Sequence, residues 1–481
     1  MPSGPSPAGQ RTPQVSPTGQ ADRLTGQDAP PIPNDHRRSR FRWLPALRHR
    51  HDREIVRLAL PAFAALIAEP LFLLTDSAII GHLGTEQLAG LGVAATLLSL
   101  SVSLCIFLAY GTTAAVARRI GAGDPAGAIR QGVDGMWLAL LIGVAMIGIG
   151  QFAADRVIGL FDTTAVVAGY ASTYLRLSLF GVPAMLVVLA ATGVLRGLQD
   201  TRTPLLVAVS AGVINVVLNL TFVYGLGLGI AGSALGTVTT QLAAATVLCL
   251  VIRHAARRHR SSVRPRWSGV VASSRAGVPL IIRTLTLQAV LVTAAGVAAR
   301  IGTVSVAAYQ IAFGIWILLA YALDAIAIAG QAIVGRYLGA ADIAGTRAAS
   351  RRMVEWGVAA GVLTGLGALL TSPLYLPLFS PDQDLRAAVV AVLPLIALFQ
   401  PIAGVVFVLD GVLIGAGDAR YLAVAGVGAM VAFLPAAAAV LARDLGLTGL
   451  WWAIGLFMLA RFSFLSTRAT GSRWMVTGAV R

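Results

Sequence analysis

Twelve apolar stretches make up most of this chain, and each is long enough to cross a lipid bilayer. A membrane-spanning helix needs about 20 mostly apolar residues. Charged residues form only 12% of the chain, compared with about 25% in soluble proteins. The sequence therefore predicts an all-α polytopic membrane protein with twelve transmembrane helices. We place them at residues 56–81, 90–115, 132–153, 165–195, 203–225, 232–252, 274–299, 305–333, 354–372, 385–414, 420–441 and 448–467.

The basic residues indicate how these helices are oriented. The chain has 37 basic residues, all of them Arg, and 21 acidic residues, which gives a net charge of +16. In the predicted topology the Arg residues lie mostly in cytoplasmic loops and at the two ends of the chain. Arg336 is counted in a cytoplasmic loop and Arg461 at the C-terminal end. The predicted outer loops hold only four, which are Arg156, Arg300, Arg386 and Arg443. This bias predicts cytoplasmic termini, and it accounts for the positive charge without nucleic-acid binding.

The two halves of the chain are repeats of each other, at a constant spacing of 218 residues. Pro61 corresponds to Pro279, and VARRIGAGDPAG (116–127) corresponds to VGRYLGAADIAG (334–345). Each half has six predicted spans, an even number, so both halves run through the membrane in the same direction. The sequence therefore predicts two parallel six-helix repeats around a central cavity, related by an axis along the membrane normal.

The domain boundaries follow from this repeat. We predict an N-lobe at 55–253 and a C-lobe at 274–468, joined by a basic cytoplasmic linker at 254–273. Residues 1–54 form an Arg-rich cytoplasmic segment, with disorder expected where Pro, Gly and Ser dominate, and residues 469–481 form a cytoplasmic tail. The sequence holds no metal-ligand cluster and no nucleophile–base set, so it predicts neither an enzyme nor a metal or cofactor site.

The first span contains two carboxylates, Glu69 and Asp76. A charged side chain at the bilayer centre costs roughly 2.5–3.5 kcal/mol, so such a residue usually faces a polar interior and has a function. The two acids are seven residues apart and share one helix face. Pro70 lies between them and predicts a kink. The alternative for both acids is a structural hydrogen bond between helices.

Polar membrane residues that occur in only one repeat are the best candidates for function. Asp76 corresponds to Ala294 in the second half, and Asn215 and Asn219 also correspond to apolar residues. At a rise of about 1.5 Å per residue, these three residues lie in the outer halves of their spans. Thr237 lies near the same level. The sequence therefore predicts an N-lobe pocket, open to the outside, formed by these four side chains.

The second half has its own set of charged membrane residues. Arg283, Asp324 and Asp410 lie toward the cytoplasmic ends of their spans, at similar estimated depths. They could form a charge-compensated cluster or a static ion pair that holds the C-lobe together. Tyr309 and Gln310 are expected to line the cavity or to join neighbouring helices.

Several motifs resemble the multidrug and toxic compound extrusion (MATE) family. They are TDSAIIGHLG (75–84), LRGLQDTRTP (195–204), INVVLN (214–219) and LDGVLIGAGD (409–418). LIIRTLTL (280–287) and the run at 323–340 resemble the branch of the DNA-damage-inducible protein F. The resemblance covers residues 55–468, including the six-plus-six repeat.

The resemblance implies an alternating-access antiporter of the plasma membrane. It would export small amphipathic or cationic compounds in exchange for H⁺ or Na⁺, as a monomer surrounded by lipid and without another cofactor. Asp76 falls on the family's cation-coupling acid, and Asn215 on a polar position of the same cavity. Arg283 falls on an Arg of the proton-coupling site, where it would pair with Asp76. Asp410 falls on an acid common in the family.

Two departures from the family favour H⁺ over Na⁺. Many relatives have Asp where this chain has Asn219, and the Na⁺-coupled branch has Glu near Leu287. A hard cation needs several oxygen ligands with charge. We therefore assign cation coupling to Asp76, Asn215, Asn219 and Arg283, with Glu69, Thr237, Tyr309, Gln310, Asp324 and Asp410 as cavity candidates. The alternatives are Na⁺-coupled export and a flippase for lipids or lipid-linked precursors.

Overall fold

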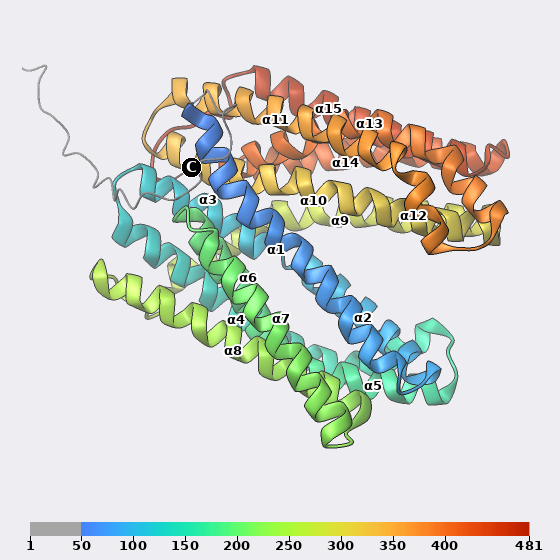
Figure 1. Ribbon diagram of the computed structural model, residues 1–481. Helices are drawn as coiled ribbons and strands as arrows, with labels where there is room; N and C mark the ends of the chain where they lie inside the picture. Colours follow the sequence, from blue (N-terminus) through green and yellow to red (C-terminus); the bar gives the residue numbers. More distant parts are fainter. Residues whose placement is uncertain (1–49, 481) are drawn as a thin grey trace, which may run out of the picture. The chain divides into compact units, whose positions relative to one another are not determined.

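The computed structural model describes residues 50–480, apart from the side chains of Arg50 and Glu69. The predictions for residues 1–49 lie outside this range. The described residues form helices and no strand (Figure 1). The first half contains α1 (Arg50–Gly81), α2 (Thr85–Leu104), α3 (Phe107–Gly121), α4 (Pro125–Ile158), η1 (Gly159–Phe161), α5 (Ala165–Leu179), α6 (Val182–Gly197), α7 (Arg202–Leu220), η2 (Thr221–Gly225) and α8 (Gly229–Arg258).

The second half repeats this order with small changes. It contains α9 (Trp267–Ile301), α10 (Thr303–Gly339), α11 (Ile343–Leu370), α12 (Ser372–Phe379), α13 (Gln383–Gly415), α14 (Ala419–Ala442) and α15 (Gly446–Thr470). Within each half neighbouring helices pack side by side, for example α7 with α8 and α14 with α15 (Figure 1). The short helix α12 is an element that the sequence analysis does not predict.

The twelve predicted spans are confirmed. Eleven helical stretches of the described residues are long and apolar enough to cross a membrane. The twelfth is the pair α5 and α6, which is bent by 52° between the two helices. Pro183 is the second residue of α6 and lacks a backbone N–H, so α5 cannot continue through it as one regular helix. In contrast, α1 continues as one helix through Pro61 and Pro70.

The repeated loops are helix-capping turns. Asp124 caps α4, because its side chain accepts a hydrogen bond of 2.7 Å from the Gly127 N–H. Asp342 caps α11 in the same way, at 2.7 Å from the Gly345 N–H. These side chains satisfy backbone donors that the first helical turn leaves open. The aspartates at these two positions are therefore structural.

The two halves meet where α3 crosses α10, and we call this contact the α3–α10 seam. Gly121 of α3 lies against the backbone of α10, where a Cβ would collide with the Arg336 carbonyl oxygen. Gly339 of α10 lies equally close to the Arg118 carbonyl oxygen of α3. Gly121 and Gly339 are 218 residues apart and so correspond in the repeat. Only a residue without a side chain allows the two backbones to approach this closely.

Candidate functional site

Asp76 is the centre of a polar site in the first half. It lies on α1 and is 8% exposed. Its Oδ1 accepts hydrogen bonds of 2.7 Å from Asn219 Nδ2 and 2.7 Å from Ser233 Oγ. Its Oδ2 accepts a longer one of 3.4 Å from the Tyr174 hydroxyl. The donors come from α7, α8 and α5, so four helices meet at one carboxylate.

Two further predicted residues extend this network. Asn219 Nδ2 also donates to Asn215 Oδ1 at 3.2 Å, one helical turn earlier on α7. Asn215 Nδ2 in turn donates to Thr237 Oγ1 of α8 at 3.2 Å. The structure thus brings together Asp76, Asn215, Asn219 and Thr237, the four residues that the depth estimate groups.

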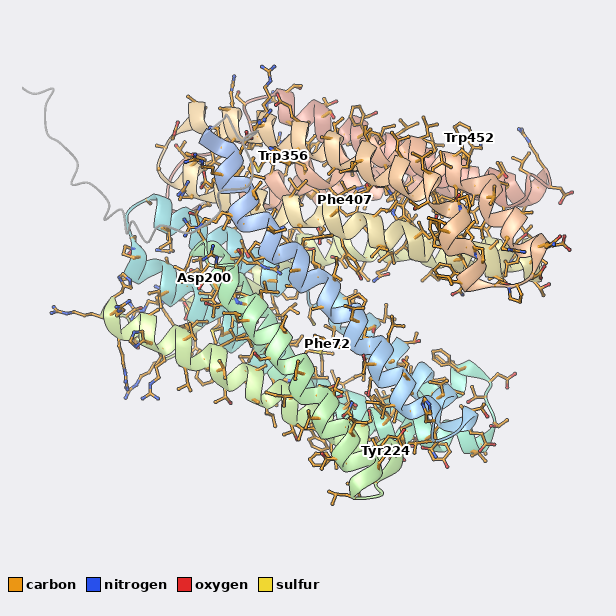
Figure 2. All side chains as sticks on the ribbon, in the orientation of Figure 1. Phe72, Asp200, Tyr224, Trp356, Phe407 and Trp452 are labelled. Carbon is orange, nitrogen blue, oxygen red and sulfur yellow. The ribbon has the colours of Figure 1, made fainter. Side chains whose placement is uncertain are left out.

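The packing around Asp76 fixes α1 against α7. On one side, the Phe72 ring occupies the space above Gly212, where any Cβ would collide with it (Figure 2). On the other side, the Tyr224 hydroxyl donates a hydrogen bond of 2.7 Å to the Ile79 carbonyl oxygen. Tyr224 lies in η2, a π-helical turn, and such turns occur often at functional sites. Asp76 is therefore held between two fixed contacts.

Ser233 and Tyr174 are site residues that the sequence analysis misses. Ser233 lies four residues before Thr237 on α8 and so shares its face. That spacing is a signal that the sequence does contain. Tyr174 gives no such signal, because it meets Asp76 only through the packing of α5 near α1, and the two residues are 98 positions apart in the chain.

The charges around Asp76 are unusual for a buried carboxylate. Among the described residues, no Arg or His forms a salt bridge with it. Its three side-chain donors, an amide and two hydroxyls, are all neutral. Burying an uncompensated charge is costly. Binding of a proton or another cation would remove that cost.

Asp410 has the opposite environment. On α13, its Oδ2 accepts a hydrogen bond from Arg283 Nη2 of α9, and its Oδ1 accepts one of 3.1 Å from Arg461 Nη2 of α15. Asp410 and Arg461 are buried, and Arg283 is largely buried, with 13% of its side chain exposed. Arg283 also lies over the ring of Tyr110 on α3, with 5.9 Å between Cζ and the ring centroid. In this cluster of the second half, one carboxylate is therefore paired with two guanidinium groups.

The structure corrects one sequence-based expectation and bears on a second. Arg461 is counted in the sequence as a cytoplasmic-end charge, but it is buried in α15, because Asp410 compensates its charge. In this structure Arg283 pairs with Asp410, as the depth estimate allows. Pairing with Asp76 in another transport state, which the resemblance implies, stays a prediction. Asp324 lies within electrostatic reach of Arg283, Arg196 and Asp410.

Tyr309 and Gln310 take part in neither of these two clusters. Tyr309 is buried in an aromatic group, with ring centroids 5.6 Å from Phe313 and 6.4 Å from Trp451. Gln310, the next residue, is exposed. The side chain of Glu69 lies outside the described part of the structure.

Known proteins resemble this chain over most of its length. The family model MatE matches residues 61–221 and 279–438, two segments that begin 218 residues apart. "Protein DETOXIFICATION 44, chloroplastic" of Arabidopsis thaliana is 31% identical over 425 residues, covering 85% of this chain and 80% of that protein. "DNA damage-inducible protein F" of Escherichia coli is 29% identical over 429 residues, covering 85% and 90%.

Solved structures share the fold. A MOP superfamily transporter from Pyrococcus furiosus has a TM-score of 0.80 at 22% sequence identity, covering 88% of this chain and 97% of that one. A crystal structure of MATE in the straight conformation has a TM-score of 0.77 at 24% identity, with the same coverage. With its twelve spans and two repeats, the chain is a multi-pass membrane protein that belongs to the MatE family of multidrug and toxic compound extrusion proteins.

Proposed function

We propose that this protein is a proton-coupled efflux antiporter of the plasma membrane, with both termini in the cytoplasm. It would export small amphipathic or cationic compounds by alternating access. Relatives named multidrug resistance proteins, such as NorM of Thermotoga maritima at 25% identity, support the direction and the substrate class. The positive-inside bias supports the orientation. The single observation that carries the coupling mechanism is the neutral environment of Asp76.

Proton binding at Asp76 would change how α1 is held. The proton would bind Oδ2, whose contact with Tyr174 is long, while Oδ1 keeps Asn219 and Ser233. Hydrogen bonds to an ionised acceptor are stronger than those to a neutral one. Neutralising Asp76 therefore weakens the attachment of α1 to α7 and α8, and this would allow the first half to rearrange and release the exported compound.

The position of the Asn219 amide favours H⁺ over Na⁺. Its nitrogen lies 2.7 Å from Asp76 Oδ1 and 3.2 Å from Asn215 Oδ1. A sodium ion would need both oxygens as ligands, and it would have to displace this nitrogen. A proton can bind to Asp76 while the Asn219 nitrogen stays beside both oxygens. Na⁺ coupling remains the alternative that the experiment distinguishes.

Transport in proteoliposomes tests this proposal. With an imposed pH gradient and a fluorescent lipophilic cation, we expect Asp76→Asn to abolish accumulation against the gradient while folding is kept. The matched control is Asp155→Asn, the same change at an exposed aspartate paired with Arg176, which should transport normally. Uphill transport by Asp76→Asn would refute the assignment.

A second part of the experiment distinguishes H⁺ from Na⁺ as the coupling ion. All Na⁺ is replaced by a large organic cation while the pH gradient stays fixed. Transport should continue at its normal rate. If transport stops, the coupling ion is Na⁺ and the proton mechanism is wrong.

A further inference from the structure

The α3–α10 seam has two sides that correspond in the repeat, a first side around Arg336 of α10 and a second side around Arg118 of α3. Different contacts hold these two sides together. Arg336 of α10 pairs with Glu54 of α1 and donates a hydrogen bond of 3.0 Å from Nη1 to Gln199 Oε1. Its counterpart in the repeat is Arg118 of α3, 218 residues earlier. Arg118 Nη1 donates to the Ala416 carbonyl oxygen at 3.2 Å, beside Gly417, the residue that corresponds to Gln199. Both Arg residues therefore donate a hydrogen bond from Nη1 to nearly corresponding places of the repeat.

The counterpart of Glu54 is missing on the second side. The corresponding residue of α9 is Ala272, which has no acceptor in its side chain. Instead, Arg118 Nη2 donates a hydrogen bond of 2.6 Å to the carbonyl oxygen of Val476. Val476 belongs to residues 471–480, which follow α15. At the 218-residue spacing they correspond to 253–262, where the chain is still helical up to Arg258, the end of α8. A backbone carbonyl of this segment thus takes the place of an acidic side chain.

The same segment is also anchored to the second half. Trp474 is 2% exposed and Met475 is 7% exposed, so both are buried, and the Trp474 indole N–H donates to the Ala469 carbonyl oxygen at 3.2 Å. The Gly478 N–H then donates to the Leu338 carbonyl oxygen of α10 at 3.0 Å. Segment 471–480 therefore joins α3 of the first half to α10 of the second.

The packing near segment 471–480 explains why the second side of the seam needs an additional contact. On the first side, α1 packs directly on α10, with Ala62 buried against Ala325 and Ile328. On the second side, α9 leaves a cavity of about 530 Å³ against α3 and α4, and Ala479 and Val480 line it. Fewer apolar contacts hold the two halves together on this side, because a void removes packing partners.

We propose that residues 471–480 are a latch that holds the α3–α10 seam closed. In an alternating-access cycle, which is part of the function proposed above, the seam must separate when the cavity opens to the cytoplasm. The Val476 and Gly478 contacts cannot both persist during that step, because they attach the segment to opposite halves. Release of the segment therefore accompanies opening, and its binding strength sets the balance between the closed and separated states.

The distance across the seam tests the latch directly. Ala122 and Ala340 are exposed, correspond in the repeat and flank the seam. Spin labels at Ala122→Cys and Ala340→Cys, with Cys105→Ala and Cys249→Ala, report this distance by electron paramagnetic resonance. Deleting residues from Gly471 onward should raise the ratio of separated to closed molecules roughly tenfold, which equals about 1.4 kcal/mol.

A milder variant and a control complete the test. Trp474→Ala removes the buried anchor alone and should shift the ratio in the same direction. Trp452→Ala is the matched control, because Trp452 is 52% exposed (Figure 2), and it should leave the ratio unchanged. If the deleted chain does not fold, Trp474→Ala decides the question. An unchanged distance distribution overturns the latch, and because it is read without transport, that failure is distinct from a failure of proton coupling.

Discussion

Asp76 and Asp410 are both buried carboxylates, but the side chains around them differ in charge. Asp76 is held by an amide and two hydroxyls, whereas Asp410 is held by two guanidinium groups. Removing the charge at Asp76 leaves no cation unpaired. Removing it at Asp410 leaves Arg283 and Arg461 without the carboxylate that both of them hydrogen-bond. The same substitution should therefore have opposite consequences at the two sites.

Asp410→Asn should reduce stability far more than Asp76→Asn does. Breaking a buried ion pair by removing one partner costs about 3–5 kcal/mol, and the thermal unfolding temperature in detergent should fall accordingly. A second change, Arg461→Met, removes one of the unpaired cations and should recover part of the loss. Equal stability of the two single variants would show that the Asp410 cluster is not a structural ion pair.

Asn219→Asp should make transport sensitive to Na⁺. The change replaces a donor beside Asp76 Oδ1 with a second carboxylate, and this supplies the charged oxygen ligands that a hard cation needs. We expect Na⁺ to stimulate transport by the variant and to leave the unchanged protein unaffected. Asn219→Ala serves as the control that removes the amide without adding charge. Absence of Na⁺ stimulation would argue against a cation site between Asp76 and α7.

At the scale of elements, the crossing of α3 and α10 sets how the halves meet. Gly339→Ala would place a methyl group against the Arg118 carbonyl oxygen, and overpacking of this kind costs about 1–3 kcal/mol. The variant should unfold at lower temperature than the unchanged protein. Gly367→Ala is the control, since a Cβ there would meet no neighbouring atom. Equal melting temperatures for both variants would show that the seam tolerates a wider crossing.

The elements could be predicted far better than the contacts between them. A backbone in lipid must satisfy its own hydrogen bonds, so a long apolar stretch has to form a helix. That constraint, with the 218-residue repeat, predicts the twelve spans. No local rule places Tyr174 beside Asp76, since the two residues lie 98 positions apart in the chain and meet only through helix packing. The sequence does not indicate that Arg461 is buried, because its counter-charge, Asp410, lies 51 residues away in the chain.

At the scale of the whole molecule, each half supplies contacts that complete the other. Cutting the chain at Ser262, between α8 and α9, should leave two fragments that assemble when they are expressed together. Their contact includes the Glu54–Arg336 and Asp52–Arg352 ion pairs and the glycine crossing. Copurification through a tag on one fragment measures the assembly. Fragments carrying Gly339→Leu should not copurify, and if they do, the seam is not what joins the halves.

Gly121 and Gly339 descend from one ancestral position, since they correspond in the repeat. In this chain each copy faces the backbone of the other helix, and no substitution can make a backbone smaller. The usual freedom of a duplicated gene, in which one copy drifts while the other keeps its role, is therefore absent at this crossing. Across descendants of the ancestral gene, we expect these two glycines to be retained or lost together.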